Sequence, residues 1–211
     1  APYVVQSGKD DYDKAHIPGA AFIDLQQDLS DTTSPYRFTC LQANQLAEKF
    51  GALGIGDNTT AVLYSQTTPQ WATRIWWLLR IVGFDRACVL DGGLTRWQTD
   101  GRAVSSETTT HPPALLTTQP RNGLLVDKET VLSAIDDDST CTINALRAVQ
   151  HAGLDSGAVG HYGRPGRIPR SVTVPTNALV EPVTMEFLPN EEIRSRLHAV
   201  GTNDADHVIT Y

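Results

Sequence analysis

The chain has 211 residues, and its 17 basic and 24 acidic side chains give a formal net charge of −7. Hydrophobic residues make up 40% and charged residues 19%, which is typical of a globular protein and excludes a disordered chain. The acidic balance disfavours nucleic acid and anionic membranes as partners. No apolar run approaches the roughly 18 residues of a membrane span, so we expect no membrane contact.

The three cysteines, Cys40, Cys88 and Cys141, lie far apart in the sequence and form no CxxC pair. This odd count fits neither a disulfide framework nor a zinc site, so we expect no bound metal. Free thiols are typical of a reducing compartment, and the predicted location is the cytoplasm.

The first half of the chain alternates strand-like and helix-like segments. Strands are predicted at VVQS (4–7), AVLY (61–64) and CVL (88–90). A long apolar segment, WATRIWWLLRIVGF (71–84), predicts a buried helix that ends at Gly83. The Trp76 and Trp77 side chains within it are expected in the core. This alternation indicates α/β units around a mainly parallel sheet.

An internal repeat relates the two halves. LGIGDNTTAVLY (53–64) matches VGTNDADHVITY (200–211), and HIPGA (16–20) matches RIPRS (167–171). A helical stretch precedes each copy of the first pair. We therefore predict two homologous domains, residues 1–110 and 123–211, joined by a Pro/Thr-rich linker at 111–122. By the plan of the first copy, the second lacks a loop, a buried helix, a strand and a closing helix, so we expect the natural protein to continue past Tyr211.

Several motifs resemble those of the tandem-domain rhodanese family, in the order of that family: HIPGA, FIDLQQDLSDTTSPYRF, WWLLRIVGF, VLDGGLTRW, YGRPGRIP and HVITY. The resemblance implies an α/β fold of two rhodanese-like domains, each a mainly parallel sheet flanked by helices, with the second incomplete here. It also implies a thiosulfate or 3-mercaptopyruvate sulfurtransferase that uses no metal and no organic cofactor. The expected partners are a small anionic sulfur donor and a cyanide or thiol acceptor.

In this family only the C-terminal half is catalytic, and a cysteine begins the loop after a VITY-like strand. A loop of backbone N–H groups at a helix N-terminus lowers the pKa of such a thiol and favours the thiolate. The resemblance places that cysteine directly after Tyr211, so the 211 residues alone are expected to be inactive. Ser65 holds the equivalent position in the first half, which we expect to be non-catalytic because serine cannot carry a persulfide.

The resemblance also implies arginines that bind the anionic end of the donor near the YGRPGRIP turn. Arg164 and Arg167 are the candidates, since a guanidinium suits a sulfonate or carboxylate; solvated surface arginines are the alternative. The chain departs from the family at Asn144-Ala-Leu146, where Asp-x-Arg is usual. Arg170 replaces a turn glycine, which predicts either a distorted turn or a negative φ.

Two other interpretations stay open. One is a non-catalytic, rhodanese-like binding or regulatory module. The other is a phosphatase relative, because dual-specificity phosphatases share the rhodanese fold; this would require a longer loop after the catalytic cysteine. Cys141 and Arg147 have the C-x5-R spacing of tyrosine phosphatases, but the residues between them alternate as in a strand, so we interpret this spacing as chance. His16 and Asp24 flank the first HIPGA turn and could orient a ligand, but His16 is expected to form hydrogen bonds with the backbone beside this turn.

Overall fold

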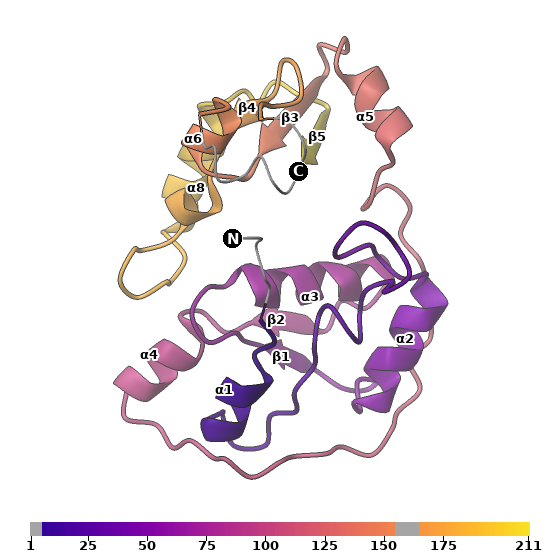
Figure 1. Ribbon diagram of the computed structural model, residues 1–211, viewed down its shortest axis with the longest axis vertical. Helices are drawn as coiled ribbons and strands as arrows, with labels where there is room; N and C mark the ends of the chain where they lie inside the picture. Colours follow the sequence, from indigo (N-terminus) through magenta and orange to yellow (C-terminus); the bar gives the residue numbers. More distant parts are fainter. Residues whose placement is uncertain (1–5, 155–164) are drawn as a thin grey trace. The chain divides into compact units, whose positions relative to one another are not determined.

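The computed structural model describes residues 6–154 and 165–211, which form two compact units, residues 6–125 and 126–211. Figure 1 shows helices around a small sheet in each unit. The α/β class predicted from the sequence is confirmed. Within the described residues, no helix is both long and apolar enough to span a membrane.

The first unit contains a parallel pair of strands, with Ala61 opposite Ala87 and Leu63 opposite Val89. Its elements are α1 (Lys9–Lys14), α2 (Ala43–Ala52), β1 (Ala61–Leu63), α3 (Gln70–Ile81), β2 (Ala87–Val89) and α4 (Gly93–Thr99). The helix predicted at 71–84 and the strands predicted at 61–64 and 88–90 are confirmed within a few residues. The strand predicted at 4–7 lies partly outside the described residues, and Gln6 and Ser7 are not in a strand.

The core of the first unit forms where α2 and α3 bury one apolar face each. Leu46 and Phe50 of α2 and Leu78 and Leu79 of α3 are fully buried in one cluster. Trp76 and Trp77, which the sequence predicts to lie in the core, are only partly buried. Each indole N–H donates to a backbone carbonyl oxygen, that of Ala87 at 3.1 Å and that of Leu124 at 2.8 Å. Together, these helices fix the ends of β1 and β2.

The stretch predicted as a linker, residues 111–122, packs along the first unit. The Ala114 N–H donates to the Gly51 carbonyl oxygen at 2.9 Å, and the Gln119 N–H donates to that of Val82 at 2.9 Å. Leu116, in the middle of the stretch, is buried in the core cluster. The connection is therefore held to the first unit over much of its length.

The second unit contains three parallel strands in the order β4-β3-β5. Its elements are α5 (Lys128–Ala134), β3 (Thr140–Asn144), α6 (Ala148–His151), β4 (Val172–Thr173), the 3-10 helix η2 (Thr176–Leu179), α8 (Asn190–His198) and β5 (His207–Thr210). β3 is the central strand, with Ile143 opposite Val172 on one side and Thr210 on the other. Of its side chains, Ile143 and Asn144 are almost fully buried.

The two repeated segments share a tertiary contact as well as a sequence pattern. In the first unit, the Ile17 N–H donates to the Tyr64 hydroxyl at 3.1 Å. In the second, the Ile168 N–H donates to the Tyr211 hydroxyl, also at 3.1 Å. Each contact joins the turn of one repeat segment to the tyrosine that closes the other.

For Arg170, the sequence predicts either a distorted turn or a negative φ. A negative φ is wrong: φ is +61°, in the same left-handed region as Gly19, its counterpart in the first repeat, at +82°. The guanidinium forms an ion pair with Asp138 and donates to the Ile135 carbonyl oxygen at 3.1 Å. A non-glycine residue is disfavoured in this region, and these contacts hold the Arg170 side chain in place. The turn therefore keeps the glycine geometry without the glycine.

Asp137, at the entry to β3, is expected to make the second unit acid-sensitive. Its carboxylate accepts hydrogen bonds from the Thr140 hydroxyl at 2.7 Å and from the Ser139 hydroxyl and N–H at 2.7 and 2.9 Å. These bonds, that of Thr140 first, lower the pKa of Asp137 from 3.8 to about 2. A carboxyl with a lowered folded pKa contributes stability above its unfolded pKa and loses that stability as the pH falls.

We therefore expect the free energy of unfolding to fall between about pH 4 and pH 2, and Asp137→Asn to flatten that part of the profile. Urea unfolding at a series of pH values measures it. The Ser139→Ala/Thr140→Val variant removes the donors instead of the carboxylate and should flatten the same range. An unchanged slope in both variants would show that Asp137 is not responsible.

Candidate functional site

The candidate site lies at the carboxyl edge of the β4-β3-β5 sheet. In parallel α/β sheets, ligands bind where the carboxyl ends of the strands meet. Here β3 ends at Asn144 and is followed by Leu146 and Arg147, while β5 ends at Thr210 and is followed by Tyr211. The chemistry available at this edge depends on these residues.

Asn144 is a structural residue of this edge. It is only 2% exposed, and its side-chain oxygen accepts the Leu146 N–H at 2.8 Å. Its carbonyl oxygen accepts the Val174 N–H at 3.0 Å, which continues the pairing of β3 with β4. The amide thus holds the turn in the way that the usual aspartate could, but Leu146 offers an apolar side chain where the resemblance expects an arginine.

Arg147 is a basic residue that the sequence reasoning assigned to chance. It is exposed, three residues past the end of β3, and precedes the four-residue helix α6. The Gln150 side-chain oxygen accepts from its backbone N–H at 3.2 Å and from its Nε at 3.3 Å. Its place three residues after the end of β3 is the signal that could have identified Arg147 as a candidate. Cys141 lies in the second position of β3, so the C-x5-R segment is a strand and a turn, not a phosphate-binding loop.

The two predicted donor-binding arginines have different outcomes. Arg164 lies outside the described residues. Arg167 is exposed and stands before β4, and its guanidinium donates to the His151 carbonyl oxygen at 3.4 Å. Arg167 therefore begins the turn that leads into β4, whereas Arg147 follows the end of β3. Donor binding by Arg167 stays a prediction.

The end of β5 is held firmly at the carboxyl edge. The Tyr211 N–H donates to the Ile143 carbonyl oxygen at 3.0 Å, and the Tyr211 carbonyl oxygen accepts the Ala145 N–H at 2.9 Å. The Tyr211 hydroxyl also contacts Ser171 Oγ, at 2.9 Å. Backbone and side chain together fix the direction in which the chain leaves β5.

Cys141, the cysteine of the second unit, lies near the start of β3 and not at its carboxyl end, and Cys40 and Cys88 belong to the first unit. Burial raises the pKa of the Cys40 and Cys141 thiols, which favours the unreactive thiol form. The Cys141 thiol lies 3.5 Å from the Val200 carbonyl oxygen, and Cys88 is exposed on β2 of the other unit. The described residues contain no group of three or more His, Cys, Asp or Glu side chains arranged to hold a metal ion.

Ser65, the counterpart position in the first unit, is engaged in its own loop. Its hydroxyl donates to the Thr68 carbonyl oxygen, and its carbonyl oxygen accepts the Leu94 N–H at 3.1 Å. These bonds give Ser65 a structural role. That the first half is non-catalytic stays a prediction.

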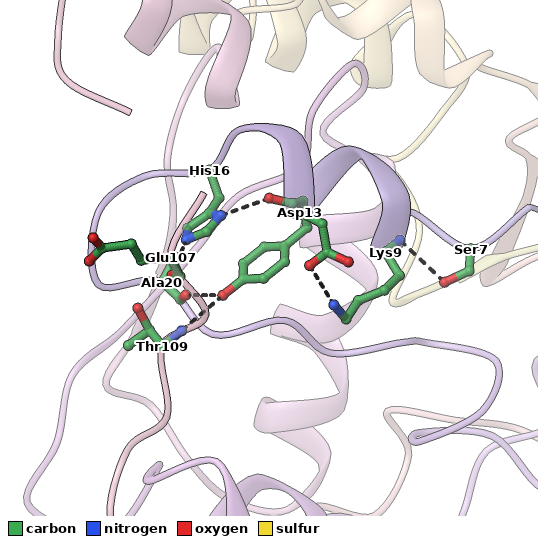
Figure 2. A network of polar contacts seen from close by, with 8 residues as sticks. Ser7, Lys9, Asp13, His16, Ala20, Glu107 and Thr109 are labelled. Atoms are coloured by element: carbon green, nitrogen blue, oxygen red, sulfur yellow. Dashed lines mark hydrogen bonds and ion pairs between the residues drawn. The ribbon is translucent and has the colours of Figure 1, made fainter. Parts of the chain in front are cut away.

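His16 contacts backbone carbonyl oxygens with both ring nitrogens, as expected. Figure 2 shows its ring close to Glu107 and Asp13. Nδ1 lies 2.7 Å from the Tyr12 carbonyl oxygen and Nε2 lies 2.9 Å from that of Glu107, and the side chain is only 1% exposed. The ring also stacks on Tyr12, with centroids 3.9 Å apart. Asp24 likewise accepts the Gln26 N–H at 2.8 Å, so both residues support the turn.

Comparison with known proteins shows that the chain is similar to proteins named as sulfurtransferases. The model of the rhodanese-like domain matches residues 7–100. The chain is 30% identical over 194 residues to the 3-mercaptopyruvate sulfurtransferase of Mus musculus, covering 90% of this chain and 62% of that protein. It is 29% identical over 194 residues to the thiosulfate sulfurtransferase of Rattus norvegicus, covering 90% and 64%.

A solved structure extends the match to the three-dimensional fold. SseA from Escherichia coli, described with the rhodanese fold and mechanism of 3-mercaptopyruvate sulfotransferases, has a TM-score of 0.84 and 26% identity, covering 97% of this chain and 75% of that one. The chain thus spans about three fifths to two thirds of the length of the curated relatives named above.

Proposed function

The chain belongs to the rhodanese family, and from that premise we propose that its protein is a sulfurtransferase. It moves a sulfane sulfur from a small anionic donor, thiosulfate or 3-mercaptopyruvate, to cyanide or a thiol. The support is that the relatives are named for these two donors and match 90% of the chain.

The proposed reaction has two half-reactions. A cysteine thiolate attacks the outer sulfur of thiosulfate, the S–S bond breaks, and sulfite leaves with the bonding electron pair. Cyanide then attacks the outer sulfur of the persulfide, which yields thiocyanate and regenerates the thiolate. With 3-mercaptopyruvate, a C–S bond breaks instead, and the carbon takes up a proton to give pyruvate. Splitting the transfer into two steps is the usual advantage of covalent catalysis.

The observation that carries the proposal is the end of β5. The Tyr211 N–H donates to the Ile143 carbonyl oxygen, and the Tyr211 carbonyl oxygen accepts the Ala145 N–H, so Tyr211 is bound to the end of β3. A residue that follows Tyr211 would therefore start at the carboxyl edge of the sheet. We propose that this next residue is the nucleophilic cysteine. Arg147, Arg164 and Arg167 are the proposed cationic groups for the donor, because a guanidinium can pair with two oxygens of a sulfonate or carboxylate.

The two halves have different proposed roles. We propose that residues 123–211 belong to the catalytic domain and residues 1–110 to a homologous domain without catalysis. The bonded state of Ser65 supports the second part. A reducing compartment such as the cytoplasm suits an enzyme whose cysteine must return to the thiolate.

The proposal predicts thiocyanate formation by the protein expressed from its complete gene. Colorimetric assays with thiosulfate and cyanide, and with 3-mercaptopyruvate and cyanide, measure it. We expect turnover with at least one donor, and none from residues 1–211 alone, because Cys40, Cys88 and Cys141 all precede β5 in the sequence, whereas the proposed nucleophile follows it.

A Cys40→Ala/Cys88→Ala/Cys141→Ala variant of the complete protein is the matched control and should keep its activity. Loss of activity in this control would place the nucleophile elsewhere. A complete protein without turnover on either donor would favour the non-catalytic binding module.

A further inference from the structure

Tyr211, Ser171 and Ile168 form a closed ring of hydrogen bonds. The Ile168 N–H donates to the Tyr211 hydroxyl at 3.1 Å, and the Ser171 hydroxyl donates to the Ile168 carbonyl oxygen at 2.7 Å. The 2.9 Å contact between Tyr211 Oη and Ser171 Oγ closes the ring. Either hydroxyl can donate in this contact, and Ser171 Oγ also lies 3.3 Å from Nε2 of His151.

The first unit contains only part of this arrangement. There, Tyr64 accepts the Ile17 N–H at 3.1 Å, and the turn hydrogen bond from Ala20 N to Ile17 O at 3.0 Å corresponds to that from Ser171 N to Ile168 O at 3.2 Å. Ala20 thus occupies the position of Ser171 and has no hydroxyl. The closed ring belongs to the second unit, which is the half that we propose to be catalytic.

We propose that Tyr211 is a positioning residue for sulfur transfer; this inference rests on the proposed function. Its hydroxyl fixes the tyrosine ring against the turn at Ile168–Ser171, while its backbone is fixed by Ile143 and Ala145 of the β3 end. The residue that follows Tyr211 therefore starts from a point held by both backbone and side chain. Tyr211 itself does not touch the reacting sulfur.

Such a role affects the chemical step more than donor binding. A small displacement of a reacting group lowers kcat because the productive geometry is reached less often. The turn also begins next to Arg167, so the ring joins the end of β5 to the one described arginine that the sequence predicts to bind the donor. A phenylalanine at position 211 keeps the ring but loses the hydrogen bonds of the hydroxyl with Ile168 and Ser171.

The test compares Tyr211→Phe with Tyr64→Phe in the protein expressed from its complete gene. Both variants remove a hydroxyl that accepts an isoleucine N–H at 3.1 Å. We expect Tyr211→Phe to lower kcat for thiosulfate and cyanide by about tenfold with KM changed by less than about twofold. Tyr64→Phe should leave kcat and KM within about twofold of wild type. Ser171→Ala, which opens the ring but keeps the Ile168 contact, should lower kcat by an intermediate factor.

Three results would overturn the inference. The first is a kcat of Tyr211→Phe within about twofold of an active wild type. The second is an equal loss of kcat in Tyr64→Phe, which would indicate a general loss of stability. The third is a wild type without turnover, which overturns the proposed function itself and is recognised before any variant is compared. Thermal unfolding of all three variants separates a folding defect from a kinetic one.

Discussion

Replacing Phe50 with alanine is expected to destabilise the unit of residues 6–125 by about 3–5 kcal/mol. Phe50 is 0% exposed and lies on α2 within the cluster that includes Leu46, Leu78 and Leu79. The substitution removes a large apolar side chain and leaves a cavity that the surrounding helices fill only in part. Urea unfolding followed by tryptophan fluorescence measures the loss, since Trp76 and Trp77 belong to the adjacent helix α3.

Tyr36→Ala is the control for this prediction. Tyr36 is also a large ring in the first unit, but it is 78% exposed. We expect its replacement to change the free energy of unfolding by less than about 0.5 kcal/mol. If Phe50→Ala cost no more than Tyr36→Ala, the core described for this unit would be wrong.

Replacing Gly93 with alanine is expected to destabilise the same unit by about 2–4 kcal/mol. Gly93 has φ of +52°, and a Cβ atom there would overlap the Ser65 carbonyl oxygen. That oxygen cannot easily move away, because it accepts the Leu94 N–H at 3.1 Å. Both the left-handed backbone at residue 93 and the displacement of the loop at Ser65 therefore destabilise the variant.

Gly101→Ala separates these two costs. Gly101 also has a positive φ, +72°, but an added Cβ would meet no atom within 4 Å. Only the backbone cost of about 1 kcal/mol is expected there. Equal losses in the two variants, measured by chemical denaturation, would contradict the close approach of Gly93 to Ser65.

The sequence predicts the regular elements well where periodicity and end signals agree. The apolar run at 71–84 becomes α3, with the chain turning at Gly83, whose φ is +93°. It does not predict the path of residues 111–122, because Pro/Thr-rich composition indicates a loop but not the backbone groups that the loop will meet. The pairing of Ala114 with Gly51 and of Gln119 with Val82 depends on tertiary structure alone.

The same limit applies to the candidate site. Asn144 and Tyr211 can be placed from the sequence because each ends or follows a strand-like segment. Arg147 is a proposed donor-binding group because it follows β3, and only the sheet shows that β3 is the central strand. The positive φ of Arg170 depends on Asp138, a partner 32 residues away. Local pattern carries no information about such a contact.

The measurement that tests the central claim most directly is peptide mass spectrometry of the complete protein after incubation with thiosulfate, without an acceptor. We predict a single added sulfur atom on a cysteine immediately after Tyr211, removed by cyanide with release of thiocyanate. Sulfur on Cys40, Cys88 or Cys141, or on no cysteine at all, would contradict the account.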